Sequence, residues 1–261
     1  MSTTPIPSSS KSAETAPSTE TAVPEVPQHP AMRIYHNLKS IVILIVVLFA
    51  VRSSIADWND VPTGSMIPTI LDGDRIFVNK LAYDLKVPFT TMHLATWSEP
   101  KRGDIVVFFS PDDGIRLVKR CVAIPGDKVF VQDNHLFIND VEVPYGPPDP
   151  KLLSTKTPAD LQQYQFSTET LGTHVHPIQT FLRPPDFQRL MHRDFGPMTV
   201  PAGKYFMMGD NRDNSRDSRY FTSGPFVDRS AIVGRAVAVA VSVDLQHYWL
   251  PRWSRFFTKL P

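Results

Sequence analysis

From residue 75 onward, short apolar runs separated by tight turns place the strongest constraint on how this chain can fold. Residues 75–78 and 104–109 are rich in branched and aromatic side chains, and a Gly-Asp pair begins or precedes each run. Residues 115–124 predict another strand, and 128–143 predict further strands joined by tight turns. Twenty-five prolines against twelve glycines favour many turns and few long helices. The sequence therefore predicts a mainly β fold.

A second segment, 144–201, differs from its surroundings because prolines are frequent and hydrophobic periodicity is poor. An irregular stretch of this length is uncommon as a loop of a compact domain, so we predict an inserted subdomain. Strand signals return at 204–208 and at 231–243, which is almost wholly apolar. We therefore expect a main β domain formed by 57–143 and 202–261, interrupted by the insertion.

The N-terminal segment divides into a polar tail and an apolar run. Seventeen of the first thirty residues are Pro, Ser or Thr, so residues 1–32 bury too little apolar area to offset the entropy of ordering, and we predict that they are disordered. Residues 41–51 are all apolar. Extended to 38–55, this run would form a helix of roughly 27 Å, close to the thickness of the hydrocarbon core of a bilayer. We predict a transmembrane anchor at 33–56.

Two alternatives to the anchor remain open. Ser54-Ile55-Ala56 has the small-x-small form of a signal-peptide cleavage site, although the long polar tail is unlike a secretory n-region. A buried helix of a soluble core would have to lack any polar face. Arg33 and Lys39 before the run, with mixed charges after it, favour a cytoplasmic tail and a C-terminal body on the far side.

Composition excludes some classes of partner and of metal site for this chain. The formal net charge is +1, from 27 basic and 26 acidic residues, so nothing global indicates a nucleic acid as a partner. The single cysteine, Cys121, excludes an intramolecular disulfide and a cysteine-based metal cluster.

The most distinctive short motif lies at 62–69. Ser65 follows Gly64 and lies between the prolines Pro62 and Pro68, whose backbone preferences predict a loop that presents one hydroxyl rigidly. We interpret Ser65 as a nucleophile.

A nucleophilic serine needs a base. None of the eight histidines lies in a recognisable catalytic context, and the sequence contains neither Gly-x-Ser-x-Gly nor His-Glu-x-x-His. His174 and His176 with His192 could bind a metal, but they lie in the proline-rich insertion without convincing further ligands. The remaining candidate base is a lysine.

Lys119 and Arg120 interrupt an apolar predicted strand. Because side chains alternate along a strand, the two should point to opposite faces, and we expect one of them to face the interior. Burial disfavours the charged amine and can lower the pKa of lysine, about 10.4 in water, by several units. Lys119 could then deprotonate Ser65. A solvated or salt-bridged lysine is the alternative.

The stretch 209–219 contains three Asp and three Arg, whose charges cancel. It lacks the glycine and glutamate spacing of an EF-hand calcium loop. A turn with internal Asp–Arg pairs fits better, and it could supply a hydroxyl that orients the lysine.

Together these motifs resemble those of the type I signal peptidases. The matching segments are 62–69, 103–106, 119–120, 125–127, 209–215, 217–219 and 233–235. They occur in the family's order over nearly the whole body. The resemblance implies a membrane-bound serine protease with a Ser/Lys dyad that removes signal peptides after small residues. It also implies a β-rich catalytic domain, formed here by the main β domain, with an inserted second β subdomain and an N-terminal transmembrane helix.

The resemblance assigns roles by position. Ser65 would be the nucleophile and Lys119 the general base. Ser215 would hold the lysine amine through a hydrogen bond, and Asp217 with Arg219 would form a supporting ion pair.

The same resemblance implies an oxyanion hole and a substrate pocket. The backbone N–H of Ser65 and the hydroxyl of Thr63 would form the oxyanion hole. Many bacterial relatives have serine at this position, and threonine keeps the hydroxyl but restricts χ1. Shallow apolar pockets for the small residues before the scissile bond would be lined by Val61, Pro62, Met66, Ile70, Leu117 and Val118.

The resemblance implies no metal, nucleotide or other cofactor. The expected partners are preprotein signal peptides and the lipid bilayer, with the secretion machinery as a further candidate. The expected location is the bacterial cytoplasmic (inner) membrane, crossed once, with the N-terminus in the cytoplasm and the catalytic domain on the periplasmic face.

Other readings of the chain stay open. A self-cleaving repressor or a specialised maturation protease could use the same dyad, although a repressor fits poorly with a membrane segment. A catalytically silent binding module would need a lost catalytic residue, and none of the matching positions is lost. An aromatic and basic C-terminal cluster either docks at the membrane interface or packs onto the body. It comprises Tyr248, Trp249, Arg252, Trp253, Arg255, Phe256 and Phe257.

Overall fold

A computed structural model describes residues 30–87, 90, 92–183, 193–245 and 248–261. Residues 1–29 of the predicted disordered tail lie outside this part of the chain. The chain divides into two units, one that ends at Ile45 and one that comprises Val46–Pro261.

Helix α1 spans Pro30–Ser54 and is 25 residues long. It begins at a proline, which is favourable in the first turn because that turn needs no backbone donor. In the part of the chain that the structure describes, no helix combines the length and the hydropathy needed to cross a membrane. The anchor at 33–56 stays a prediction.

The body is mainly β, as predicted, with few and short helices. Its strands are β1 (Ala56–Asp60), β2 (Asp74–Asn79), β3 (Asp84–Lys86), β4 (His93–Thr96), β5 (Ile105–Phe109), β6 (Arg116–Ala123), β7 (Lys128–Gln132), β8 (His135–Ile138), β9 (Val141–Glu142), β10 (Tyr145–Gly146), β11 (Tyr164–Leu171), β12 (His174–Phe181), β13 (Phe195–Thr199), β14 (Lys204–Met208), β15 (Val227–Asp228), β16 (Ile232–Asp244) and β17 (Leu250–Pro251). Its helices are α2 (Pro150–Ser154), α3 (Pro158–Gln163) and the 3₁₀ turns η1 (Gly64–Met66), η2 (Lys80–Ala82), η3 (Arg229–Ala231) and η4 (Trp253–Arg255).

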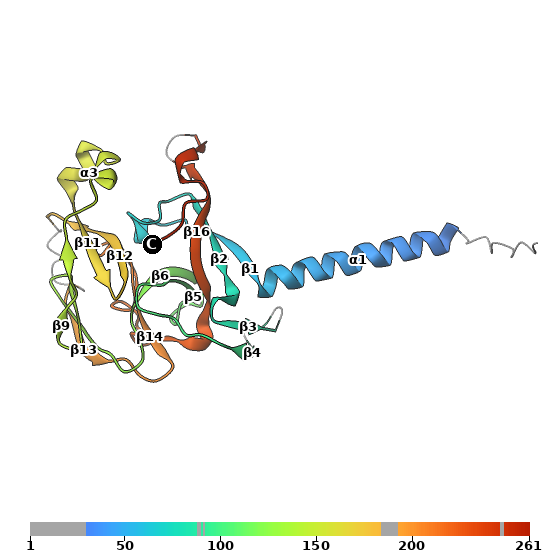
Figure 1. Cartoon of the computed structure of the whole chain (residues 1–261), viewed down its shortest axis with the longest axis horizontal. Helices are drawn as coiled ribbons and strands as arrows, with labels where there is room; N and C mark the ends of the chain where they lie inside the picture. Colours follow the sequence, from blue (N-terminus) through green and yellow to red (C-terminus); the bar gives the residue numbers. More distant parts are fainter. Residues whose placement is uncertain (1–29, 88–89, 91, 184–192, 246–247) are drawn as a thin grey trace, which may run out of the picture. The chain divides into compact units, whose positions relative to one another are not determined.

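The largest sheet has the strand order β1-β2-β16-β5-β6-β14-β15, and β17 pairs with β16. All of its pairings are antiparallel, and the long strand β16 lies between β2 and β5 (Figure 1). A four-stranded sheet has the order β13-β7-β8-β9, and a three-stranded sheet the order β10-β11-β12. Strands β3 and β4 form a separate two-stranded sheet.

The position of strand β5 in the sheet explains why its sequence is continuously apolar. Ile105 and Val107 pack in a cluster with Met66 of the 62–69 loop, while Val106 and Phe108 pack in a second cluster. Because side chains alternate along a strand, these clusters cover the two faces of the sheet. A strand that is buried on both faces has no polar side, which matches the uniform run.

The predicted insertion, 144–201, contributes to two sheets. Strands β11 and β12 form a regular hairpin with eight paired positions, which lie side by side in Figure 1. Strand β13 pairs instead with β7 of the four-stranded sheet. The hairpin lacks a visible hydrophobic period because Glu169, His176 and Gln179 occupy fully buried positions in it. The domain boundaries at 143/144 and 201/202 stay a prediction.

The C-terminal cluster divides by residue type. Trp249, Trp253 and Phe257 expose most of their side chains. Arg255 instead forms an ion pair with buried Asp74, at 2.6 Å between Nη2 and Oδ2. Arg255 thus packs onto the body and Phe256 is half-buried, while Trp249, Trp253 and Phe257 face outward.

Candidate active site

The nucleophile loop is fixed at both ends by backbone hydrogen bonds. Val61 donates its N–H to the carbonyl of Asp74 at 3.0 Å, and Gly73 donates to the carbonyl of Val61 at 3.2 Å. Within the 3₁₀ turn η1, Met66 is fully buried and Ser65 is only 8% exposed. These hydrogen bonds and this burial tie the loop to the body around Ser65. The role of Ser65 as the nucleophile stays a prediction.

Lys119 of β6 lies against this serine. Its Nζ donates hydrogen bonds to Ser65 Oγ at 2.7 Å and to the carbonyl of Val118 at 2.9 Å. Lys119 is 2% exposed. Burial lowers the pKa of its amine to about 8, although the charges of Asp217 and Asp210 act in the opposite direction. The lowered pKa makes the neutral form of the amine more accessible, and a neutral amine within hydrogen-bond distance of a hydroxyl is the arrangement that a Ser/Lys dyad requires.

Both cations of the Lys119-Arg120 pair are buried, whereas the sequence predicted one of them to face the interior. Arg120 forms a bidentate pair with Asp210, at 2.9 Å and 2.8 Å, and donates to the carbonyl of Gly103 at 2.7 Å. Two faces of β6 are covered, so each cation needs its own buried acceptors. The Asp210 carboxylate is 90 residues away in sequence, which is why strand alternation alone missed it.

The 209–219 segment contains the predicted ion pair. Arg219 contacts Asp217 through Nε and Nη2, both at 2.9 Å, and Gly209 donates its N–H to the same carboxylate. Burial acts to raise the pKa of Asp217, but the Arg219 guanidinium holds it below the ordinary value. Ser215 is buried, and among the described residues its hydroxyl makes no hydrogen bond to Lys119. Its hydrogen bond to Lys119 stays a prediction.

Glycine at 209 allows this segment to lie against the nucleophile loop. A Cβ added at Gly209 would be 2.4 Å from the carbonyl oxygen of Ser65 and 2.2 Å from Ser215 Oγ. Neither separation is compatible with a carbon atom, so no larger residue fits without moving the nucleophile.

Asn211 makes two hydrogen bonds to the backbone of the nucleophile loop, and the sequence assigned it no role. Its side-chain amide donates to the carbonyl of Gly64 at 2.9 Å, and its backbone N–H donates to the carbonyl of Ser65 at 3.1 Å. The backbone of Gln179, in β12, pairs with the other side of this segment. The asparagine in the motif was the available signal, but sequence separation concealed its partners.

Thr63 lies beside the nucleophile. Its Oγ1 is 3.4 Å from Ser65 Oγ, and the residue is exposed to solvent. The hydroxyl is therefore close enough to contact an atom bonded to Ser65 Oγ. Its role as an oxyanion donor stays a prediction.

The predicted pocket residues differ in exposure and location. Val61, Met66 and Ile70 belong to one hydrophobic cluster, with Val118 packed against it, whereas Leu117 packs against the other cluster. Met66 and Ile70 are fully buried, so neither offers surface to a substrate in this structure. Pro62 is exposed, and Leu117 and Val118 are half-buried. Their pocket role stays a prediction.

The histidines considered as metal ligands lie elsewhere. His176 is 1% exposed and faces Glu169, with 3.3 Å between Nε2 and Oε1. His192 lies outside the described residues. Among the residues that the structure describes, no three His, Cys, Asp or Glu side chains are grouped as metal ligands.

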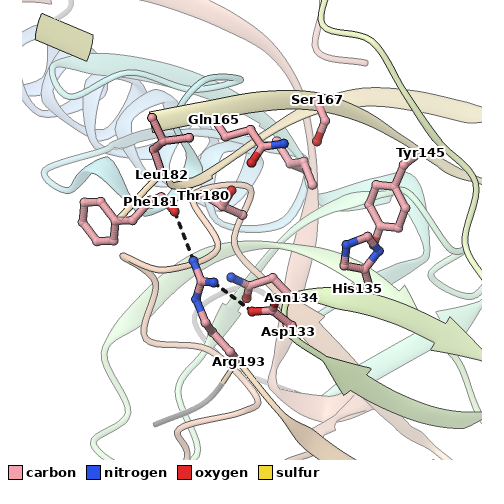
Figure 2. Close-up of a pocket in the computed structure, with 11 residues that line it drawn as sticks. Asp133, Asn134, His135, Tyr145, Gln165, Ser167, Thr180, Phe181, Leu182 and Arg193 are labelled. Carbon is pink, nitrogen blue, oxygen red and sulfur yellow. Dashed lines mark hydrogen bonds and ion pairs between the residues drawn. The ribbon is translucent and has the colours of Figure 1, made fainter. Parts of the chain in front are cut away.

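Two cavities lie near these elements. The first, which we call the β16 cavity, has a volume of about 420 Å³ and is lined in part by Val61 and Pro62 of the nucleophile loop. The second, the hairpin cavity, has a volume of about 460 Å³ (Figure 2). In it, Arg193 donates to the Phe181 carbonyl and to Asp133, and the rings of His135 and Tyr145 lie edge to face.

The family model and the similar proteins point to the same family, the signal peptidases. The family model described as "Signal peptidase, peptidase S26" matches residues 34–241. A signal peptidase I from Pseudomonas fluorescens is 37% identical over 230 residues, covering 83% of this chain and 76% of the relative. One from Pseudomonas aeruginosa is 35% identical over 228 residues, with the same coverage. A crystal structure of a signal peptidase I from Enterococcus faecalis is 28% identical and covers 54% of this chain and 98% of that chain, with a TM-score of 0.32.

Proposed function

The chain belongs to the signal peptidase family of the S26 peptidases, and we propose that it is a membrane-bound serine endopeptidase that cleaves signal peptides from exported preproteins after small residues. Family membership supports the removal of signal peptides. One observation supports the mechanism: Lys119 Nζ, buried and with its pKa lowered to about 8, lies 2.7 Å from Ser65 Oγ.

The first chemical step forms an acyl-enzyme. The neutral amine of Lys119 takes the proton of Ser65 Oγ as this oxygen attacks the scissile carbonyl carbon. The negative charge that develops on the carbonyl oxygen is stabilised by the Ser65 N–H and the Thr63 hydroxyl. As the carbon–nitrogen bond breaks, the Lys119 ammonium returns its proton to the departing amine of the mature protein.

The second step releases the signal peptide. Lys119, again neutral, takes a proton from a water molecule that attacks the ester carbonyl. The tetrahedral intermediate uses the same two oxyanion donors. It then expels Ser65 Oγ, which regains its proton from Lys119. The signal peptide leaves with a free carboxyl group at its C-terminus, and the enzyme returns to its starting state.

The supporting residues keep the amine in place. Asp217 and Arg219 pair within the 209–219 segment, and we assign Ser215 the role of orienting the Lys119 amine during the reaction. No metal or cofactor has a part in these steps. We assign recognition of the small residues before the scissile bond to the surface around Pro62, Leu117 and Val118, which remains accessible in the structure.

We assign the chain a single membrane crossing at 33–56, with the N-terminus in the cytoplasm and the body on the periplasmic face of a bacterial inner membrane. The described side chains of α1 from Ile41 to Phe49 are apolar and exposed, which supports contact with lipid. The partners are then preprotein signal peptides and the bilayer, with the secretion machinery as a further candidate partner.

Cleavage of a purified preprotein by the full-length chain in detergent tests the mechanism. Ser65→Ala, Lys119→Ala and Lys119→Arg should all lose cleavage, the last because arginine stays charged and cannot act as a base. Ser110→Ala, at a buried serine elsewhere in the body, and Lys204→Ala should cleave like the wild type. Cleavage at the wild-type rate by the Ser65 or Lys119 variants would refute the dyad.

A second substrate tests the cleavage specificity. Replacing the small residues before the scissile bond by leucine should abolish cleavage by the wild-type chain. Equal cleavage of both preproteins would contradict the proposed preference for small residues.

A further inference from the structure

The β16 cavity lies where the second half of β16 meets the start of the nucleophile loop. Its apolar lining consists of Val61, Pro62, Val241, Val243, Leu245 and Trp249. The volume of about 420 Å³ is more than ten times the roughly 30 Å³ that one water molecule occupies in the liquid. An alanine side chain, a single methyl group, would leave most of this space empty. The cavity therefore suits larger side chains than those expected next to the scissile bond.

The charged groups at the cavity are already paired. Arg75 Nε lies 2.5 Å from Asp60 Oδ1, and Arg255 Nη2 lies 2.6 Å from Asp74 Oδ2. Since each acid has a cation beside it, the lining offers a ligand little net charge. The remaining lining surface is apolar, so the cavity should bind apolar ligands in preference to charged ones.

The cavity is close to the nucleophile along the chain. Val61, which lines it, precedes Ser65 by four residues, so their Cα atoms are at most about 15 Å apart. An extended peptide advances about 3.3 Å per residue, so a substrate residue about five positions from the scissile bond can reach Val61. In a signal peptide, the segment at this distance is the end of the apolar h-region, which precedes the small-residue cleavage site.

We propose that the β16 cavity binds apolar side chains at the C-terminal end of the h-region, so that the enzyme recognises a second part of the signal peptide besides its small residues. This inference rests on the proposed function. It assigns Val241, Leu245 and Trp249 to substrate binding, a role that the sequence did not suggest. Leu245 and Trp249 are 40% and 69% exposed, so both have surface available for a ligand.

The test pairs enzyme variants with substrate variants. Two preproteins differ only at residues five to seven before the cleavage site, which are leucine in one and serine in the other. Leu245→Ser in the full-length chain should lower kcat/KM for the leucine substrate about five-fold to ten-fold, mainly through KM, because the apolar contact is lost. It should change kcat/KM for the serine substrate less than two-fold. Leu161→Ser is the matched control, since Leu161 is 45% exposed on α3 outside the cavity.

Binding without cleavage separates this inference from the dyad mechanism. Fluorescence anisotropy of the two labelled signal peptides on the Ser65→Ala chain should show tighter binding of the leucine peptide. Adding Leu245→Ser should remove that preference. If Leu245→Ser removes the binding preference and Ser65→Ala does not cleave, both the cavity proposal and the dyad mechanism are supported. If Ser65→Ala still cleaves, the dyad mechanism is refuted, and the cavity proposal is judged by the binding data alone.

Two outcomes would overturn the proposal. If Leu245→Ser weakens cleavage of both substrates equally, the cavity contacts lipid or detergent rather than the substrate. If neither substrate responds and the binding preference persists, the h-region binds elsewhere. Melting curves of Leu245→Ser and Leu161→Ser verify that each variant is folded, so a loss of binding can be read as a loss of contact.

Discussion

The side-chain amide of Asn211 donates a hydrogen bond of 2.9 Å to the carbonyl of Gly64, the residue before the nucleophile. The backbone N–H of Asn211 bonds in addition to the carbonyl of Ser65. Two successive carbonyls of the nucleophile loop are thus held by one residue. The opposite ends of these peptide units carry the N–H groups of Ser65 and Met66, so Asn211 sets the direction of a predicted oxyanion donor.

Asn211→Ala should lower kcat about five-fold with little change in KM, because a lost hydrogen bond of about 1 kcal/mol frees the loop to turn away from the transition state. Asn211→Asp should be worse, since its carboxylate would face the Gly64 carbonyl. Asn214→Ala, at an exposed asparagine in the same segment, is the control. An Asn211→Ala variant that changes KM alone would assign this residue to substrate binding instead.

Gly209→Ala should abolish cleavage, because its Cβ would be 2.4 Å from the Ser65 carbonyl oxygen and would displace the loop. Gly172→Ala is the comparison, since a Cβ there has no atom within 4 Å and meets only the strain of a φ of +63°. Steady-state cleavage and a melting curve of each variant separate the two effects. A fully active Gly209→Ala chain would show that the loop and the segment can move apart.

The pH dependence of kcat/KM should follow the Lys119 amine. Burial lowers its pKa to about 8, and the base is the neutral form, so the rate should rise tenfold per pH unit below 8 and level off above it. At pH 6.5 the rate should be about 3% of its maximum, from the same titration. Measurement of initial rates from pH 5.5 to 9.5 gives the midpoint. A midpoint near 6.5 would indicate a histidine as the base.

Glu169→Leu should lower the free energy of unfolding by about 3–5 kcal/mol, because it leaves the buried guanidinium of Arg212 without a counter-ion. Arg212 Nη2 lies 2.5 Å from Glu169 Oε1, and both side chains are almost fully buried. The double variant Glu169→Leu with Arg212→Met should recover much of the loss, since it removes both charges. Urea denaturation measures all three, and a double variant no more stable than Glu169→Leu would show that the loss does not come from the unpaired guanidinium of Arg212.

The sequence predicted the parts of the fold in which burial and apolarity coincide. Strand β5 is buried on both faces by aliphatic side chains, so its run of branched residues was sufficient. The resemblance implied an inserted β subdomain, but no local pattern located the β11–β12 hairpin. Its buried positions hold Glu169, His176 and Gln179, which pair with one another or with the 209–212 segment rather than following an apolar period.

The site divides in a similar way. Ser65 and Lys119 were predictable because each residue is unusual in its local context, a hydroxyl in a rigid loop and a cation in an apolar strand. The burial of Arg120 and the contacts of Asn211 depend on partners far away in sequence, Asp210 in one case and Gly64 in the other. Local patterns carry no information about such pairs.

The Glu169–Arg212 pair also bears on how this chain could be shortened. The hairpin supplies the carboxylate and the 209–219 segment supplies the guanidinium, so the residues beside the nucleophile depend on a counter-ion delivered from the insertion. Excising 144–201 as a removable appendage would leave Arg212 as an unpaired buried cation two residues from Asp210, the carboxylate that pairs with Arg120. A minimised enzyme would have to keep this hairpin or replace Arg212 with a neutral side chain in the same step.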